Sequence, residues 1–180
     1  PTDYRGQGEK ELGLFKCASR FRKDGNTLVI DGGDILQGSP LGAFCHDTIG
    51  SAARFAEMMN RCGYDYVTLG NHDFNYGMPY LDSYLNVLKA RCVCENVRWD
   101  EAGVRFPARI HTLENGLRVG IIGIVTDYVN IWEKPEHLAD IAITDPIPAV
   151  AAALERLRDQ VDLTVGIYHG GFERDLATGR

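Results

Sequence analysis

The chain has 180 residues, enough for one domain with a sizeable core, and its 44% hydrophobic and 24% charged content argue against a disordered protein. Nineteen basic against 25 acidic residues give a net charge of −6, which excludes a nucleic-acid polymer bound through a basic surface. The longest apolar run, residues 120–125, is too short to cross a bilayer, so no membrane partner is expected.

Helical and strand-like patterns alternate along the chain. Apolar residues at steps of three and four predict helices, and short β-branched runs between glycines or prolines predict strands. The expected elements, in chain order, are a helix over 11–23, a strand over 27–30, a helix over 47–61, a strand over 64–70, a helix over 79–90, strands over 91–97, 104–112 and 117–125, an irregular stretch over 128–145, a helix from Pro146 and a last strand over 162–171.

This alternation predicts the α/β fold class, in which helices cover the faces of a largely parallel sheet. The dipeptide Asn115-Gly116 predicts a tight hairpin, which adds an antiparallel component and makes the sheets mixed. The sequence contains neither an internal repeat nor a low-complexity linker. One domain is therefore expected.

Polar residues and glycines follow three of the predicted strands. Because ligands gather outside the carboxyl ends of parallel strands in α/β folds, these residues are expected to converge on one site. Carboxylate, amide and imidazole ligands together suit Mn²⁺, Fe or Zn²⁺. A single strand-end Asp or Asn is commonly a turn or cap residue, but three such ends favour a metal site. The residues concerned are Asp31, Asp34, Asn71, His72, Asp73 and His169.

The segments GDILQGSPLG, GNHDFNYG and YHGG resemble three sequence blocks of the calcineurin-like dimetal phosphoesterases. Within that superfamily the chain resembles the 5′-nucleotidase group, and most closely the bacterial 2′,3′-cyclic-nucleotide 2′-phosphodiesterase/3′-nucleotidases. The segments DYRGQGEKELGLFKCASRFRKD and IGIVTDYVNIWEKP support this branch, and the resemblance covers nearly the whole chain. It implies a four-layer α/β/β/α metallophosphoesterase sandwich with mixed sheets, of which this chain forms part.

The resemblance also implies roles for individual residues. Asp34 matches a carboxylate that bridges two divalent metal ions (Mn, Zn, Fe or Co), and Asn71 and His169 match ligands of one of them. His72 matches the catalytic histidine that faces the scissile phosphate. The implied reaction is attack of a metal-bridging water on a phosphate ester of a nucleotide, either a phosphomonoester or a cyclic phosphodiester.

The partner of His72 is open at this point. Some 5′-nucleotidases pair this histidine with an aspartate three residues further on, where this chain has Asn75. An amide can orient an imidazole, but it cannot stabilise an imidazolium as a carboxylate does. Asp73, or a residue elsewhere, is therefore expected to take the catalytic role. Asn75 is a weaker candidate, as is Asn96 at another strand end.

Two blocks of the family pattern are missing from the sequence. The segment Thr2-Asp3-Tyr4 is not the family's D-x-H block, and no histidine follows His169 to form its G-H-x-H block. The nucleobase-binding domain of the family is absent as well. Residues 1–180 are therefore expected to be a partial catalytic domain, inactive when isolated.

Other interpretations remain. The same scaffold serves 5′-nucleotidases and nucleotide-sugar hydrolases, and a different class would be a non-catalytic binding module whose metal site has decayed.

The other strand-end and aromatic residues have simpler explanations. Structural or surface roles are expected for His46, His111, His137, Asp31, Tyr128, Trp132 and Tyr168.

The compartment is suggested only by weak signals. The five cysteines show no C-x-x-C spacing, so we expect free thiols, which are typical of a reducing compartment. The chain begins at Pro1 without a secretory signal. These features favour the cytoplasm, whereas the family is often extracytoplasmic.

Overall fold

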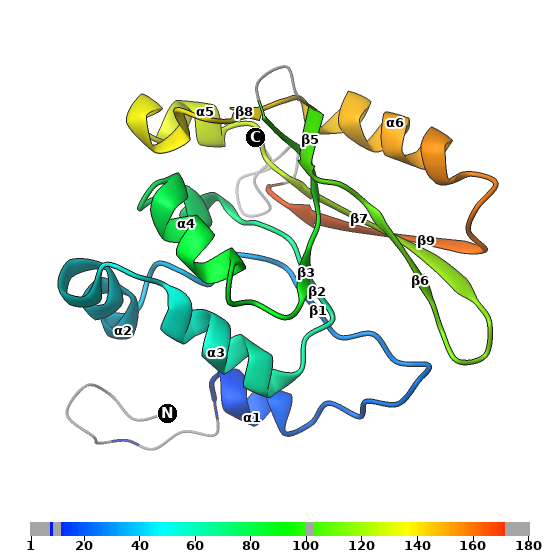
Figure 1. The fold of residues 1–180 in the computed structure, drawn as a ribbon, viewed down its shortest axis with the longest axis horizontal. Coiled ribbons are helices and arrows are strands. Elements are labelled where there is room, and N and C mark those ends of the chain that lie inside the picture. Colours follow the sequence, from blue (N-terminus) through cyan, green and yellow to red (C-terminus); the bar gives the residue numbers. More distant parts are fainter. Residues whose placement is uncertain (1–7, 9–11, 100–102, 172–180) are drawn as a thin grey trace, which may run out of the picture.

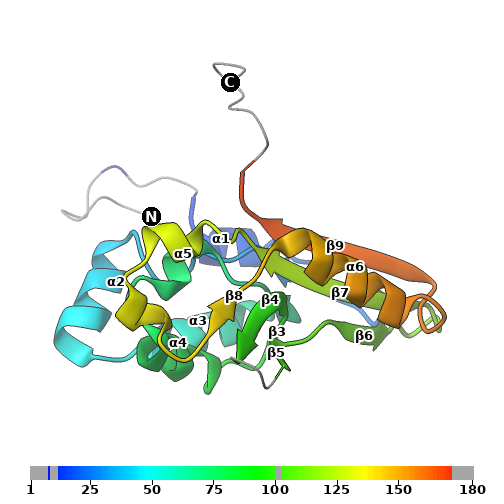
Figure 2. The same cartoon turned by 90° about the horizontal axis from the view of Figure 1, so that it is seen from above.

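The computed structural model of the protein describes residue 8 and residues 12–99 and 103–171. Short strands occupy the middle of the fold, and helices lie on either side of them (Figure 1). Seen from above, α3 and α4 lie on one side of β3 and β4, and β9 and α6 lie on the other side (Figure 2). The alternation of helices and strands along the chain is confirmed.

The strands form three sheets of three strands each within the described residues. The first is parallel, in the order β1-β2-β3, and the second is antiparallel, in the order β5-β4-β8. The third joins an antiparallel pair, β6-β7, to a parallel pair, β7-β9. The strands are β1 (Ile30–Asp31), β2 (Tyr66–Val67), β3 (Arg91–Cys92), β4 (Cys94–Trp99), β5 (Gly103–Phe106), β6 (Arg109–Thr112), β7 (Arg118–Val125), β8 (Ala142–Ile143) and β9 (Leu163–His169).

Six α-helices and three short helical turns of other types accompany the strands in the described part of the chain. The α-helices are α1 (Leu14–Ala18), α2 (Pro40–Phe44), α3 (Ala53–Cys62), α4 (Met78–Leu85), α5 (Val129–Trp132) and α6 (Pro146–Leu157). The turns are the π-helical η1 (Cys45–Ile49) and the 3₁₀-helical η2 (Asn71–Phe74) and η3 (Pro135–Leu138). At the start of α6, the Asp145 carboxylate accepts a hydrogen bond from the Ile147 N–H at 2.8 Å, as in a standard N-cap.

Three hydrophobic clusters give the order of the layers. Successive strand residues point to opposite faces. Val67 of β2 accordingly packs with α3 and α4, whereas Tyr66 packs with Ile121 of β7. On the other face of β7, Ile122 packs with Leu157 of α6. The layers are therefore helix, sheet, sheet and helix, and the predicted α/β/β/α arrangement with mixed sheets is confirmed.

Several predicted helix boundaries are wrong. The helix expected over 47–61 begins only at Ala53, because Gly50 adopts a left-handed conformation (φ 69°) that ends η1. The helix expected over 11–23 is reduced to α1, which buries no residue and so lacks the packing that stabilises longer helices. The helix expected over 79–90 ends at Leu85.

The region after β4 differs from the prediction in detail. The strand expected over 104–112 is divided into β5 and β6 around Pro107, which has no N–H to donate to a sheet. The Asn115-Gly116 hairpin is confirmed, since the Leu113 N–H donates to the Leu117 carbonyl at 2.9 Å and Gly116 has φ 88°. The stretch 128–145, expected to be irregular, contains α5, η3 and β8.

Two further expectations concern membranes and cysteines. None of the helices in the described residues has the length and apolar character needed to cross a membrane. The five cysteines are free thiols, and three of them are buried. A buried free thiol behaves as a small hydrophobic side chain.

The start of β7 is tied to the start of β9 by an ion pair whose effect on stability should depend on pH. The Arg118 guanidinium donates to both carboxylate oxygens of Asp162, and these bonds lower the pKa of Asp162 to about 2. A lowered folded-state pKa adds stability above pH 3.8, which is lost as the pH falls toward 2. Urea unfolding should therefore show a stability difference between the wild type and Asp162→Asn at pH 5 that vanishes near pH 2. A difference that stays constant over this range would contradict the assignment.

Candidate functional site

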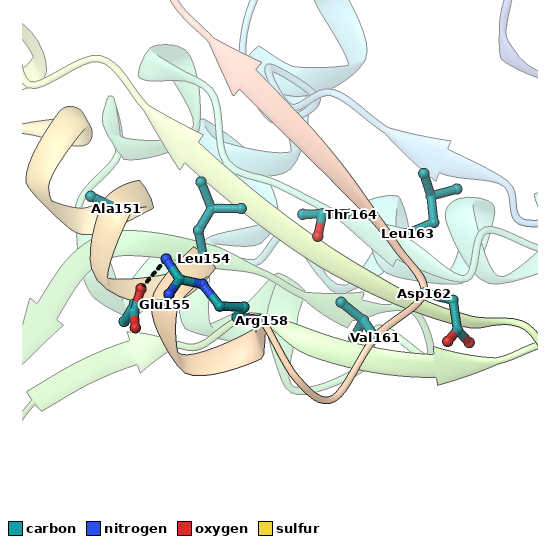
Figure 3. Close-up of a pocket in the computed structure, with 8 residues that line it drawn as sticks. All are labelled: Ala151, Leu154, Glu155, Arg158, Val161, Asp162, Leu163 and Thr164. Carbon is teal, nitrogen blue, oxygen red and sulfur yellow. Dashed lines mark ion pairs between the residues drawn. The ribbon is translucent and has the colours of Figure 1, made fainter.

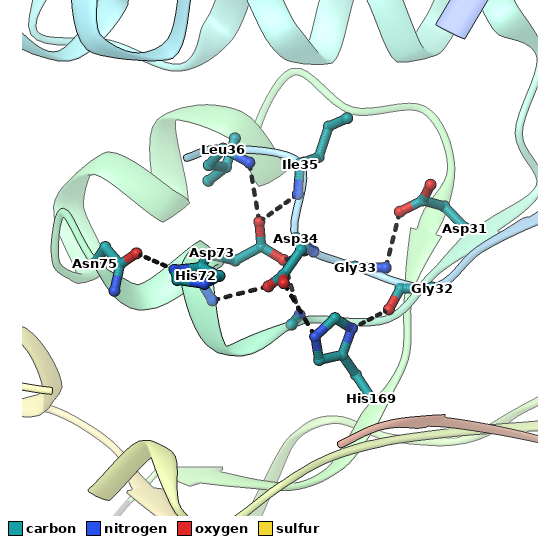
Figure 4. Close-up of polar contacts among 11 residues, drawn as sticks. Asp31, Gly32, Gly33, Asp34, Ile35, Leu36, His72, Asp73, Asn75 and His169 are labelled. Carbon is teal, nitrogen blue, oxygen red and sulfur yellow. Dashed lines mark hydrogen bonds and ion pairs between the residues drawn. The ribbon is translucent and has the colours of Figure 1, made fainter. Parts of the chain in front are cut away.

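Two loops meet at the carboxyl edge of the first sheet. One follows β1 and contains Asp34, and the other follows β2 and begins with η2. Since β1 and β2 are parallel neighbours, both loops leave the sheet at the same edge. His169, the last residue of β9, reaches this edge from the third sheet (Figure 4). The predicted convergence of the three strand ends is therefore what the structure shows.

Asp73 holds the two loops together. The residue is 2% exposed, and its carboxylate accepts four backbone N–H groups at 2.8–3.1 Å. Burial raises the pKa of Asp73 to about 6, and three of these backbone donors oppose the rise. With both oxygens occupied in this way, Asp73 does not orient the His72 ring. The catalytic role predicted for Asp73 is therefore replaced by a structural one. The backbone donors belong to Asp34, Ile35, Leu36 and Gly70.

Two glycines allow the loops to come this close. Gly33 has φ 92°, and a Cβ atom on it would collide with the backbone of Leu69 and Gly70. A Cβ atom on Gly70 would collide with the backbone and carboxylate of Asp34. Only glycine fits at both positions, which explains why glycines flank the predicted site residues.

Asp34 and His169 form the centre of the cluster. Asp34 has the left-handed value φ 68°, and its Oδ1 accepts the His72 backbone N–H at 2.8 Å. Its Oδ2 lies 3.2 Å from Nε2 of His169. The opposite nitrogen, Nδ1 of His169, donates to the Gly32 carbonyl at 2.7 Å, so the ring presents Nε2 to Asp34. Figure 4 shows these side chains converging from the two loops and from β9.

His72 is exposed, and its ring is oriented by an amide. Nδ1 of His72 lies 2.7 Å from Oδ1 of Asn75, the weaker of the candidates expected for this position. The Asn75 amide in turn donates to the Glu133 carboxylate. Asn71, one residue before His72, is the first residue of η2 and is half-buried. No sequence pattern placed Glu133 at the site, since it lies 58 positions after Asn75 in the stretch expected to be irregular.

The remaining candidates lie outside the cluster or support it. Asn96 is fully buried, and its side chain bonds to Val125 and Thr144, so its expected place near the site is replaced by a role in holding strands together. Asp31 accepts the Gly33 N–H at 2.9 Å, as expected for a strand-end partner, and burial raises the pKa of its carboxyl group.

Two of the other histidines also have structural contacts. His46 stacks on Tyr76 with 3.9 Å between ring centroids, and Nδ1 of His111 lies 3.2 Å from the Tyr66 hydroxyl. These contacts agree with the structural or surface roles expected for both residues.

The donor atoms of the predicted ligand set decide whether the site can hold a divalent metal ion. Among the described residues, no group of three or more His, Cys, Asp and Glu side chains is arranged to hold a metal ion. The predicted set counts only Asp34 and His169 of these types, and its third member is the amide of Asn71. A histidine that donates Nδ1–H to a carbonyl and presents Nε2 to a carboxylate has the arrangement usual for a metal-binding imidazole. The pairing of Asp34 and His169 therefore fits a metal ion.

An open groove of about 510 Å³ lies elsewhere, between α6 and β9 (Figure 3). Leu154, Val161 and Leu163 line it. Leu163 begins β9 and His169 ends it, so at about 3.3 Å per residue the groove lies about 20 Å from the polar cluster. The groove is therefore separate from the candidate site.

Comparison with known proteins places the chain in a family. Residues 12–175 match the family model described as calcineurin-like phosphoesterase. The chain belongs to this family. It is 30% identical to the trifunctional nucleotide phosphoesterase protein YfkN of Bacillus subtilis, over 96% of the chain and 13% of that protein. It is 29% identical to the 2′,3′-cyclic-nucleotide 2′-phosphodiesterase/3′-nucleotidase of Yersinia enterocolitica, over 96% of the chain and 29% of that protein.

Solved structures of calcineurin-like phosphoesterases and 5′-nucleotidases share the fold. The calcineurin-like phosphoesterase YfkN from Bacillus subtilis superposes with a TM-score of 0.78 at 28% identity, over 98% of this chain and 60% of that one. A 5′-nucleotidase precursor from Thermus thermophilus gives a TM-score of 0.68 at 28% identity, over 87% of this chain and 30% of that one. The predicted membership of the phosphoesterase family, and with it the hydrolase class of its relatives, is confirmed. The chain spans less than a third of the curated relatives named above.

Proposed function

We propose that the chain carries part of the active site of a metal-dependent phosphoesterase that hydrolyses phosphate esters of nucleotides. The observation that carries the proposal is the convergence of Asp34, His169 and η2 at one sheet edge, in a member of the calcineurin-like phosphoesterase family. The named relatives act on nucleotides, some as 5′-nucleotidases and some on 2′,3′-cyclic nucleotides. We propose the second activity for this protein, with a 5′-nucleotidase or nucleotide-sugar hydrolase as the alternative.

Asp34, Asn71 and His169 would hold a divalent metal ion. Such an ion supplies Lewis-acid stabilisation of phosphate oxygens and a nucleophile at neutral pH. Asp34 presents Oδ2 while its Oδ1 is held by the His72 backbone N–H, and His169 is held by the Gly32 carbonyl. Both ligands are therefore oriented before any ion or substrate arrives, which reduces the cost of binding.

His72 would bind the phosphate ester and act on its leaving oxygen. The ring is exposed, and Nδ1–H donates to Asn75, so Nε2 points away from that bond and is free to meet a substrate. General acid catalysis requires a donor within one hydrogen bond of the reacting oxygen, and Nε2 is such a donor in the imidazolium form of the ring, in which both nitrogens carry protons. Asp73 does not take part in this step, because its oxygens are occupied by backbone N–H groups.

Titration calorimetry with Mn²⁺ tests the proposed ligand set. The wild-type chain is expected to bind Mn²⁺, and Asn71→Ala is expected to lower the affinity at least about tenfold, because one of three protein ligands is lost. His111→Ala is the matched control, since this histidine bonds to Tyr66 away from the cluster. Equal affinity in all three proteins would contradict the ligand assignment.

The substrate is tested with the complete protein encoded by the gene. In the presence of Mn²⁺ it should hydrolyse 2′,3′-cyclic AMP faster than 5′-AMP. A clear preference for 5′-AMP would favour the 5′-nucleotidase alternative. A protein that binds nucleotides but hydrolyses neither would instead be the non-catalytic binding module, and the proposed function would be rejected.

A further inference from the structure

Four side chains from three segments form a continuous hydrogen-bonded chain behind the exposed face of His72. Nδ1 of His72 contacts Oδ1 of Asn75 at 2.7 Å, and Nδ2 of Asn75 donates to Oε1 of Glu133. The second oxygen of Glu133 contacts Nδ1 of His137 at 2.9 Å. The chain thus runs from η2 through the end of α5 to η3, and it joins segments that are about 60 residues apart in the sequence.

Glu133 determines which way the Asn75 amide faces. The oxygen and nitrogen ends of an amide have nearly the same shape, so His72 alone does not select one of them. A carboxylate accepts hydrogen bonds and donates none, so the end that faces Glu133 must be the NH₂ group. The oxygen of Asn75 must then face His72, and it accepts a hydrogen bond from Nδ1–H. Glu133 therefore selects the tautomer of His72 in which Nδ1 carries a proton.

Glu133 is itself held in a fixed position. Its side chain is 7% exposed, and each of its two oxygens has a partner, one on Asn75 and one on His137. Its backbone N–H donates to the Val129 carbonyl at 2.9 Å, which fixes it at the end of α5. A nearly buried carboxylate is costly unless it is fully hydrogen-bonded, and here both oxygens are.

We propose that Glu133 is a positioning residue that acts on His72 through Asn75. It orients the ring and keeps Nε2 pointing outward, the task that an aspartate next to the histidine would perform directly. What His72 does with Nε2 rests on the proposed function, whereas the tautomer assignment rests on the contacts alone. Glu133 does not touch the substrate and is not a catalytic residue.

The test compares Glu133→Ala with the isosteric Glu133→Gln in the complete protein. In ¹⁵N-histidine-labelled samples at neutral pH, long-range ¹H–¹⁵N spectra should show His72 protonated at Nδ1 in the wild type. The alanine variant should lose this preference, because the Asn75 amide can then turn over. The glutamine variant should show an intermediate preference, because its carbonyl can still accept from Asn75, whereas its amide can also turn over and donate. We expect kcat to fall about tenfold or more in the alanine variant, with KM changed less than about twofold.

Glu136→Ala serves as the control, because Glu136 is an exposed acid in the same segment. An unchanged His72 tautomer in Glu133→Ala would overturn the inference, as would equal losses of kcat in the alanine and glutamine variants. Failure of the proposed function would look different. No variant, nor the wild type, would then hydrolyse nucleotides, while the histidine spectra would still report whether Glu133 sets the tautomer.

Discussion

Replacing Asp73 by asparagine is expected to lower the free energy of unfolding by about 4 kcal/mol. The asparagine would put an NH₂ group where a carboxylate oxygen now accepts two backbone N–H groups, so two buried donors would face another donor. Those donors are in the loops after β1 and β2, at Asp34 and Gly70. Urea unfolding of both proteins at neutral pH measures the difference.

Asp31→Asn is the matched control for this prediction. Asp31 is the last residue of β1 and accepts only the Gly33 N–H among the bonds found for its side chain, through one oxygen that an asparagine retains. The free energy of unfolding of Asp31→Asn should be lower than that of the wild type by about 1 kcal/mol or less. A change below 1 kcal/mol in Asp73→Asn would show that the backbone N–H groups find other partners, and would refute the role assigned to Asp73.

The centre of the candidate site could be predicted because its placement follows from topology. A run such as 27–30 predicts a buried parallel strand, and parallel neighbours end at the same edge. The sequence therefore predicts that Asp34 and His169 lie close together, and in the structure Oδ2 of Asp34 is 3.2 Å from Nε2 of His169. The layer order followed from the resemblance, and the packing of β2 and β7 confirms it.

The roles of adjacent residues could not be predicted in the same way. Asn71, His72 and Asp73 occupy one 3₁₀ turn, in which each residue faces a different direction. The sequence does not show that Asp73 points inward to the backbone N–H groups while His72 stays exposed. A polar strand-end residue such as Asn96 is equally ambiguous, because a fully bonded core amide and a ligand have the same sequence pattern.

Glu133 shows a second limit of the sequence. Its stretch has no regular periodicity, so nothing places it next to Asn75, 58 residues away. Because position 75 is an amide, the sequence predicted that Asp73 or a residue elsewhere would be the partner of His72. The structure indicates that a carboxylate lies one residue further along the hydrogen-bonded chain.

Replacing Asp34 by asparagine is expected to separate function from stability. Asparagine tolerates the left-handed φ of 68° and keeps an oxygen for the His72 N–H, so the free energy of unfolding should change by less than about 1 kcal/mol. The charge and the oxygen that faces His169 are lost. In the complete protein we expect nucleotide hydrolysis to fall at least about 1,000-fold, since metal-assisted stabilisation is worth several kcal/mol.

Initial rates with Mn²⁺, measured beside urea unfolding, test this separation. Asp47→Asn is the control, because Asp47 is an exposed acid on η1 whose side chain forms a hydrogen bond only with His46 among the described residues. More than a tenth of the wild-type activity in Asp34→Asn would contradict the ligand role. A large loss of stability would instead mean that Asp34 holds the two loops together as Asp73 does. In that case the left-handed conformation of Asp34 would be needed for folding. A variant that is stable but inactive would show that this conformation is needed for the function of the site.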